Sequence, residues 1–288
     1  MAIITISRGC FSHGTEIAKR VTEMLGYKLV SREMIISEAS KHYNISEKEL
    51  LKSIHDGPTI LERVTHGREK YLSYLQAVLM RYAMDDNLVY HGNAGHFLLP
   101  EIDHLLKIRI IADMEDRILF TQKLENLSRQ EAIDYIQKDD KHRARWTSYL
   151  YNVDIKDPSI YDIVLNIGRL SFDDACNIIA YTAKSDSCKT SKKSKNAVFD
   201  LAISSQVKAA IQNLSEAVTE VKVTSNNGLV NIKAQMSSIR KSGYVNPETE
   251  KKMSEKMQHD LIEEISRSVG EIPGIKDIIY DIETPHFS

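Results

Sequence analysis

The sequence lacks the features that would place the protein outside the cell or in a membrane. It has only 3 cysteines, Cys10, Cys176 and Cys188, and they form no C-x-x-C pair and no His/Cys cluster at the spacing of metal ligands. No stretch approaches ~18 continuous apolar residues, and the first residues carry no charged leader or small-residue cleavage site. We therefore expect a soluble cytoplasmic protein without a disulfide framework or a transmembrane segment.

An excess of charge of one sign is also absent. The 38 Lys and Arg residues nearly balance 40 Asp and Glu residues, for a formal net charge of -2. This balance excludes a broad polycationic surface, so we expect no nucleic-acid partner and no attachment to an anionic membrane through charge alone. Any phosphate binding must therefore be local.

A glycine-bracketed loop is the most informative feature that the sequence does contain. Gly9 and Gly14 bound a loop that follows the apolar run at residues 2–6 and precedes a helical pattern. The glycines have the spacing of the phosphate-binding motif G-x-x-x-x-G-K-[ST], but Thr15 replaces its lysine and Glu16 replaces its hydroxyl residue. Backbone N–H groups at the helix start still favour an anion. The loop predicts a phosphate site without its main cation.

The first 183 residues alternate between short apolar runs and long amphipathic segments. This order predicts a parallel α/β sheet flanked by helices. Strands are expected at residues 3–6, 27–30, 88–91, 108–112 and 163–166. Helices at residues 32–55 and 59–84, with an S-x-x-E start signal at Ser46 and Glu49, form a substrate insert that resembles a lid, and residues 114–161 form a second insert. We expect a P-loop sheet with substrate and lid inserts.

The rest of the chain has a different composition and pattern. Residues 184–196 are rich in Lys and Ser and predict a solvated linker. Beyond it we expect a helix at 200–216, strands at 218–224 and 229–234, a helix at 247–269 and a strand at 275–282. An Asn-Gly pair, Asn227-Gly228, predicts a tight hairpin between the first two strands. The domains are therefore predicted as 1–183, a linker at 184–196, and a small α+β domain of αββαβ order at 197–288.

The motifs of the first domain together resemble the cytidylate kinase-like family, whose members are relatives of the P-loop nucleoside monophosphate kinases. The resemblance covers residues 2–183 and rests on Ile4-Thr5-Ile6-Ser7-Arg8-Gly9, Gly14-Thr15-Glu16-Ile17-Ala18, Ser31-Arg32-Glu33, Val89-Tyr90-His91-Gly92-Asn93-Ala94, Glu115-Asp116-Arg117-Ile118, Asp140-Lys141-His142-Arg143 and Tyr161-Asp162-Ile163-Val164-Leu165-Asn166. It implies phosphoryl transfer from ATP, with Mg²⁺, to a nucleoside monophosphate similar to CMP.

The resemblance also implies roles for individual residues. It assigns catalysis to Arg8, Lys141 and Arg143; nucleotide binding to Gly9, Ser12, His13, Gly14, Thr15, Glu16, Arg117 and Arg145; acceptor binding to Arg32 and Asn93; and a magnesium contact through water to Glu16. By the same resemblance, Arg117 stacks on the nucleotide base. The chain departs from the family at Thr15, Ser31 and Asn93, where a charged residue is common. Each departure removes a charge from a loop expected at the ligand-binding edge of the sheet.

Structural alternatives remain open for several of these residues. For His13 a polar loop residue is the favoured alternative, because phosphoryl transfer to a phosphate acceptor needs no strong base. Glu16 is equally explained by its favourable interaction with the helix dipole. The charged segment at 139–146 suits an exposed helix stabilised by i,i+4 pairs. On such a helix Arg143 and Arg145 point in different directions, so that one can bind phosphate while the other pairs with an aspartate.

The second domain is similar to BON modules around residues 227–230 and 270–275. That resemblance implies sensing or docking of an unknown ligand or partner, whereas a packing or dimerisation module, and hence a homo-oligomer, is an open alternative. Two functions follow for the whole chain. It is either a working nucleoside monophosphate kinase, or a nucleotide-binding regulatory protein that no longer transfers phosphate and signals through its second domain.

Overall fold

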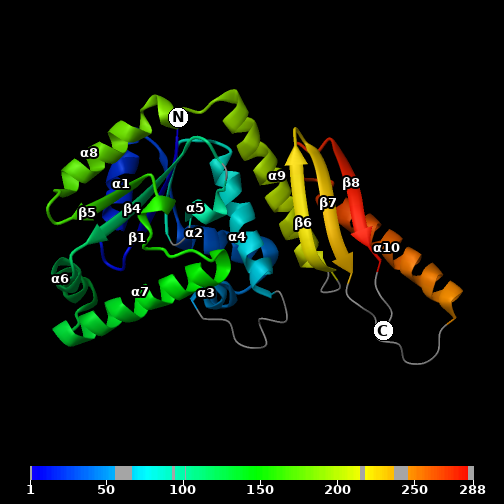
Figure 1. The fold of residues 1–288 in the computed structure, drawn as a ribbon, viewed down its shortest axis with the longest axis horizontal. Helices are drawn as coiled ribbons and strands as arrows, with labels where there is room; N and C mark the ends of the chain where they lie inside the picture. Colours follow the sequence, from blue (N-terminus) through cyan, green and yellow to red (C-terminus); the bar gives the residue numbers. More distant parts are fainter. Residues whose placement is uncertain are drawn as a thin grey trace. The chain divides into compact units, whose positions relative to one another are not determined.

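The computed structural model describes residues 2–55, 67–92, 95–100, 102–214, 218–236 and 246–284. The chain divides into two compact units, one made of Met1–Thr59 with Tyr82–Lys195 and the other of Ile60–Arg81 with Asn196–Ser288. Each unit has its own sheet and its own hydrophobic core (Figure 1).

The first unit is built on a parallel sheet. Its strands are β1 (Ile3–Arg8), β2 (Lys28–Ser31), β3 (Leu88–His91), β4 (Leu105–Ala112) and β5 (Ile163–Ile167), in the order β2-β3-β1-β4-β5. All neighbouring strands run parallel. The central strand β1 is buried along almost its whole length, as expected for a strand of a parallel sheet that is covered on both faces. The predicted fold class and all five predicted strands are confirmed.

Two helices close one side of this core. Helix α1 (Gly14–Leu25) follows the glycine loop and lies beside α8 (Phe172–Ala183) (Figure 1). Both bury an apolar stripe, which includes Ile17 and Val21 of α1 and Ile179 of α8, in the core that contains β1. Helix α1 ends at Gly26, whose φ of 67° suits the left-handed C-cap. The loop at its start is therefore carried by a firmly packed element.

The expected substrate insert between β2 and β3 contains three helices among the described residues, α2 (Arg32–Tyr43), α3 (Glu47–His55) and α4 (Gly67–Ala83). The short helix α5 (Gly95–Leu98) follows β3. The predicted start signal is confirmed at α3, where the Ser46 N–H donates to Glu49 Oε2 at 3.1 Å and the Glu49 N–H donates to Ser46 Oγ at 3.2 Å. Residues 59–66 of the predicted second helix lie outside the described residues.

The second insert forms a helical hairpin of α6 (Met114–Glu125) and α7 (Arg129–Tyr151), followed by a short 3₁₀ helix, η1 (Pro158–Ile160). A second capping box, which the sequence analysis missed, starts α7 at Ser128 with Glu131. The charged segment at 139–146 was expected to be an exposed helix, and this is only partly so: Lys141 and Arg145 are exposed, whereas Asp139, Asp140 and Arg143 are half-buried. Trp146 is buried and packs edge-on against Tyr151.

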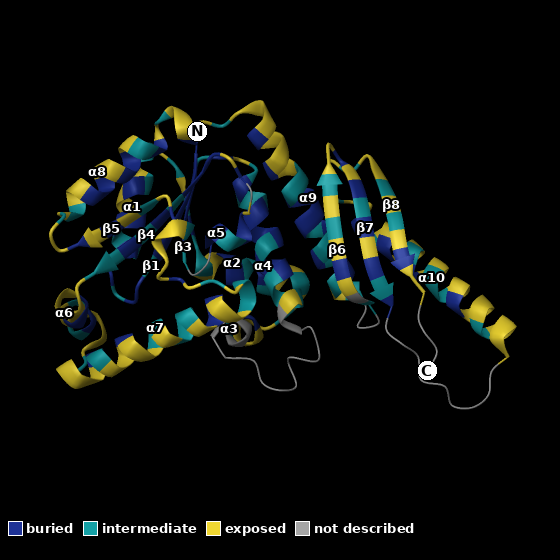
Figure 2. Cartoon of the chain, viewed as in Figure 1, coloured by how far each residue is buried: buried dark blue, intermediate teal, exposed yellow. Residues whose placement is uncertain are grey.

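The second unit is a small α+β module. It contains most of α9 (Lys192–Leu214), the strands β6 (Val218–Asn226) and β7 (Leu229–Met236), the helix α10 (Pro247–Val269) and the strand β8 (Asp277–Glu283). Strands β6 and β7 are antiparallel, and β7 and β8 are parallel. Along β7 the buried residues Val230, Ile232, Ala234 and Met236 alternate with more exposed ones (Figure 2). The αββαβ order is as predicted, while its likeness to BON modules stays a prediction.

The predicted hairpin has the turn geometry that its sequence requires. Asn227 and Gly228 have φ values of 52° and 84°, which suit a type I′ turn. The Asp200 carboxylate of α9 accepts hydrogen bonds from the Ser225 hydroxyl at 2.8 Å and from the backbone N–H groups of Asn227 and Gly228 at 2.9 and 3.1 Å. Helix and hairpin are thus joined at a single carboxylate.

The predicted domain division differs from the structure in two places. The expected linker at 184–196 contains a 3₁₀ helix, η2 (Asp186–Cys188), and the start of α9, because Cys188 supplies an apolar anchor buried in the first core. In addition, Ile60–Arg81 groups with the second unit. There Tyr74 of α4 is fully buried and its hydroxyl donates to Asn213 Oδ1 of α9 at 3.2 Å.

Candidate functional site

The loop between β1 and α1 is shaped by its two glycines. A Cβ on Gly14 would lie 2.6 Å from Arg8 Cδ, and one on Gly9 would lie 2.8 Å from Ser12 Oγ. Only glycine therefore allows the Arg8 side chain to cross the start of α1. Between the glycines, Phe11 and His13 have positive φ values of 53° and 60°, an uncommon conformation for such residues. The loop is held in a strained, specific shape at a helix N-terminus.

The lid hairpin is hydrogen-bonded to the backbone of this loop at Cys10. The Cys10 N–H donates to Asp140 Oδ1 at 3.1 Å, and the Cys10 carbonyl accepts from Arg117 Nε at 2.7 Å. Arg117 and Asp140 also pair with each other, at 2.7 Å between Nη2 and Oδ2. Both backbone groups of Cys10 are thus bonded to one ion pair, in which Arg117 belongs to α6 and Asp140 to α7. Burial, with nearby Asp139, raises the pKa of the Cys10 thiol to about 12, so it stays protonated at neutral pH.

Three arginines from separate elements meet beside the loop. Arg8 ends β1, Arg32 begins α2 directly after β2, and Arg143 lies on α7. Together with other residues they line one small cavity of about 10 Å³, whose lining comprises Arg8, Arg32, Glu33, His91, Gly92 and Arg143. The cavity lies where β1, β2 and β3 end, which is the edge of a parallel sheet at which such folds bind ligands.

Neighbouring groups hold two of these arginines in position. Arg143 is 11 % exposed at its side chain; its Nε lies 2.6 Å from Asp139 Oδ2, and its Nη1 donates to the Arg8 carbonyl at 3.2 Å. Arg32 Nη2 donates to Glu33 Oε1 at 2.9 Å. Burial lowers the pKa of Arg8, and repulsion from Arg143 adds to this shift. The cluster therefore concentrates positive charge that an anion would relieve.

The structure separates the expected site residues into groups. It brings Arg8, Gly9, Ser12, Gly14, Arg32 and Arg143 together around the loop and the cavity. Lys141 and Arg145 are exposed on α7 and do not line the cavity, so the expected difference between Arg143 and Arg145 is present. Arg117 is 9 % exposed and bonded to Cys10 and Asp140, so its guanidinium is not offered to a base in this conformation. Asn93 lies outside the described residues.

Thr15 and Glu16 occupy the first turn of α1 and are partly buried. Within the described ranges, no group of three or more His, Cys, Asp or Glu side chains has an arrangement suited to a metal ion. Glu16 is the acidic residue of the first turn of α1. A single carboxylate suits Mg²⁺ that is held mainly by substrate phosphates, because Mg²⁺ keeps several waters and uses few protein ligands.

A shallow groove of about 440 Å³ adjoins the other side of the loop. It is lined by His13, Asp116, Leu119, Phe120, Lys123, Ile167, Gly168 and Leu170. The rings of His13 and Phe120 have their centroids 4.1 Å apart. The sequence did not indicate this groove, since the segments around Phe120 and Leu170 have the same amphipathic pattern as many other parts of the chain. The sequence analysis also missed His91, although a histidine that ends a strand of a parallel sheet was a usable signal.

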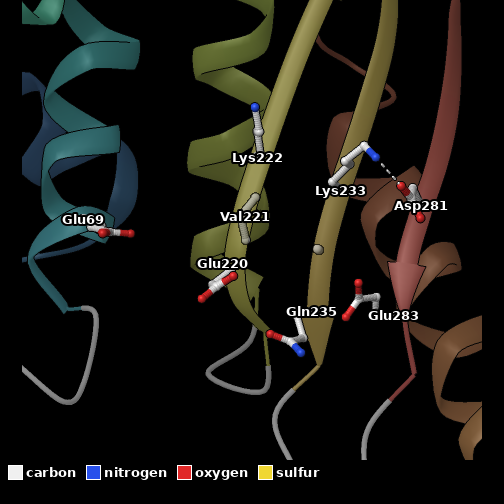
Figure 3. A pocket seen from close by; sticks show the side chains of 9 residues that line it. Glu69, Glu220, Val221, Lys222, Lys233, Gln235, Asp281 and Glu283 are labelled. Carbon is white, nitrogen blue, oxygen red and sulfur yellow. Dashed lines mark ion pairs between the residues drawn. The ribbon is translucent and has the colours of Figure 1, made fainter.

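A groove of about 520 Å³ also exists in the second unit, over the face of the sheet turned away from its core (Figure 3). Its charged residues are Glu69, Glu220, Lys222, Lys233, Asp281 and Glu283. Lys233 Nζ forms an ion pair with Asp281 Oδ2 at 2.7 Å. The other carboxylates of the groove do not form a metal-binding group among the described residues. We assign no ligand to this groove.

No helix in the described part of the chain is both long and apolar enough to cross a membrane.

Comparisons with known proteins agree with this geometry. Residues 3–169 match the Cytidylate kinase-like family. The chain is 27 % identical over 196 residues to a cytidylate kinase of Pyrobaculum aerophilum, covering 67 % of this chain and 99 % of that relative. It is 30 % identical over 168 residues to a cytidylate kinase of Methanothrix thermoacetophila, covering 58 % of this chain and 89 % of the relative.

A solved structure supports the same fold. An uncharacterized protein from Eubacterium ventriosum superposes with a TM-score of 0.52 at 19 % identity, covering 64 % of this chain and 99 % of that protein. The family match ends at residue 169 and leaves the second sheet outside it. Because the matched residues exceed half of the chain and carry the glycine loop, the lid hairpin and all five strands of the parallel sheet, the chain belongs to the cytidylate kinase-like family, a family of nucleoside monophosphate kinases.

Proposed function

We propose that this protein transfers the γ-phosphoryl group of ATP to a nucleoside monophosphate similar to CMP. The observation that carries the proposal is the meeting of Arg8, Arg32 and Arg143 in one cavity beside the glycine loop. Asp139 and Glu33 pair with Arg143 and Arg32, and the three guanidinium groups together still make this cavity a favourable place for an anion. Phosphoryl transfer needs this arrangement, because it depends on positioning and on positive charge rather than on covalent chemistry by side chains.

The two sides of the loop suggest where each substrate binds. The loop backbone and the start of α1 would cradle the phosphates of ATP, and the buried Ser12 hydroxyl, which has no hydrogen-bond partner, can donate to one of them. The groove at His13 and Phe120 offers an aromatic and apolar surface to the base. Arg32, which begins α2, would bind the acceptor phosphate, with Arg8 and Arg143 between the two substrates.

The residues present fit ATP and Mg²⁺ in this scheme. The aliphatic part of the Arg8 side chain crosses the start of α1 beside Gly14, one residue before Thr15, and the side chain lines the arginine cavity. We propose that Arg8 and Arg143 supply the charge that Thr15 lacks. Mg²⁺ would bind the phosphates of ATP and neutralise part of their charge, and Glu16 would hydrogen-bond to the water molecules bound to Mg²⁺.

A coupled assay with ATP and each nucleoside monophosphate tests the proposal. We expect turnover that depends on Mg²⁺ and is fastest with a pyrimidine monophosphate. Purified protein that binds nucleotide normally in calorimetry but shows no turnover with any acceptor would contradict kinase activity. Failure to bind any nucleotide would contradict the nucleotide site as a whole.

A second function is favoured by Thr15 alone. Without a cation at this position, the protein could bind nucleotide, transfer no phosphate, and report the bound state through the second unit. The two functions predict opposite effects of Thr15→Arg. In a working site, a fourth guanidinium next to Arg8 would be repelled, and we expect kcat/KM to fall about tenfold.

The assay of Thr15→Arg has a matched control in Thr15→Ser, which keeps the hydroxyl and should stay within about threefold of the native rate. A large gain in activity with Thr15→Arg would instead identify a degenerate site and support the regulatory function.

A further inference from the structure

His91 lines the arginine cavity, and the sequence analysis gave it no role. It ends β3, pairs in register with Ile6 of β1 and Ser31 of β2, and is only 6 % exposed. Its ring lines the cavity together with the three arginines. A buried histidine at the ligand-binding edge of the sheet needs a physical explanation.

The hydrogen-bonding state of His91 supplies that explanation. Its Nδ1 is buried and has no hydrogen-bond partner, and the same holds for Arg8 Nε. Such atoms cost free energy in a folded protein, and they are tolerated where a ligand completes their bonding. Both residues line the same cavity, so in the tautomer with its proton on Nδ1, His91 and Arg8 Nε would both find a partner in one acceptor-only group such as a phosphate.

Its surroundings keep His91 uncharged. Burial lowers the pKa of His91 to about 4, and Arg8 of β1 adds to this effect. Glu33 of α2 and Glu16 of α1 act in the opposite direction, and Lys19 of α1 acts with Arg8; Arg32 and Arg143 also line the cavity. At neutral pH the imidazole therefore adds a hydrogen-bond donor without adding a further positive charge to three neighbouring guanidinium groups.

We propose that His91 is a fourth phosphate-binding group of this cavity and donates a hydrogen bond from Nδ1 to the phosphate of the acceptor nucleotide. The proposal rests on the proposed function, in which the cavity receives a monophosphate. Its volume of about 10 Å³ holds roughly one water, so the anion must displace side chains as it enters. Arg32, 22 % exposed at its side chain, is the natural one to move.

The test compares His91→Leu with His91→Asn. Leucine removes the donor, whereas the asparagine amide can place an N–H near the position of Nδ1. We measure the Kd of inorganic phosphate, CMP and ATP by calorimetry, and the KM and kcat for CMP. His91→Leu should weaken phosphate and CMP about tenfold or more, as expected for a lost hydrogen bond to an anion, and should leave the Kd of ATP unchanged. His91→Asn should stay within about threefold of the native protein.

His96→Leu is the matched control. His96 is also buried and has an unpartnered ring nitrogen, Nε2, and burial likewise lowers its pKa to about 4. Its ring, however, packs against Phe97 and Tyr161 and does not line the arginine cavity. Its replacement should therefore not change phosphate affinity.

The outcomes separate a binding role from a structural one. If His91 only fills space, His91→Leu will bind phosphate as the native protein does, or His91→Leu and His91→Asn will weaken binding equally; either result overturns the proposal. Native protein that binds phosphate and CMP without turnover would contradict the kinase function but leave the role of His91 measurable by binding. Native protein that binds neither phosphate nor CMP would overturn both.

Discussion

Replacing Arg143 with methionine is expected to lower kcat/KM for phosphoryl transfer about 100-fold to 1,000-fold. Removal of one preorganised donor from a site of developing negative charge has an effect of this size. Arg143 is nearly buried, faces Arg8 and lines the arginine cavity, so solvent cannot replace it. Methionine keeps the length and the apolar contacts of the side chain but removes its charge. Steady-state kinetics with ATP and CMP measure the loss.

Arg145→Met is the matched control for this prediction. Arg145 lies on the same helix, two residues farther on, and is exposed in another groove beside Tyr149. Its replacement should change kcat/KM by less than about threefold. Equal losses in the two variants would mean that charge on the lid acts through its overall field, and would contradict a specific phosphate contact by Arg143.

Replacing Gly228 with alanine is expected to destabilise the second unit by on the order of 3 kcal/mol. Gly228 has a φ of 84°, and a Cβ there would lie 2.4 Å from the carbonyl oxygen of Gly274. That oxygen belongs to the backbone segment that leads into β8, and the Lys276 N–H in turn donates to the Gly228 carbonyl at 2.9 Å. The clash therefore cannot be relieved by rotation of a side chain and must separate two backbone segments.

Gly270→Ala provides a control within the same unit. Gly270 ends α10 with a φ of -61°, which suits alanine, and a Cβ there would lie 3.1 Å from the Ser266 carbonyl oxygen, a much milder contact than the one at Gly228. It should change stability by less than about 1 kcal/mol. Urea unfolding followed by circular dichroism measures both variants. The single tryptophan of the chain, Trp146, lies in the first unit, so its fluorescence reports that unit separately. Equal midpoints for the two variants would contradict the proposed backbone contact.

Much of the fold was predictable, because its signals are local. Every strand of the parallel sheet appears as a short apolar run, and the order of the elements requires neighbouring strands to be parallel. The hairpin was predictable from Asn227 and Gly228, since the two residues adopt the positive φ values that the turn needs. The capping box at Ser46 was predictable for the same reason, because it depends on residues three apart.

The failures arose where long-range contacts outweighed local composition. The Lys/Ser-rich segment predicted a linker, yet Cys188 anchors it in the first core and α9 begins within it. The sequence also gave no sign that Arg117 bonds Cys10 and Asp140, which are far away in sequence; its expected contact with a base stays a prediction. Hydrophobic periodicity cannot reveal such pairings, because each joins residues of different elements and depends on how those elements pack in the folded chain.

The sequence by itself thus predicted a phosphate-binding loop, a parallel α/β fold and a kinase-like order of motifs. These signals depend on glycine spacing and hydrophobic periodicity, which involve residues close to each other in the sequence. The substitution at Thr15 made the loop look depleted of charge. The resemblance named Arg8, Arg32 and Arg143 among the site residues, but only the tertiary structure showed that these three, from three separate elements, line one cavity while Lys141 and Arg145 do not. It also added His91, at the end of a fourth element, to the cavity. The physical reason is that parallel strands end at one edge of the sheet, so side chains distant in sequence meet there.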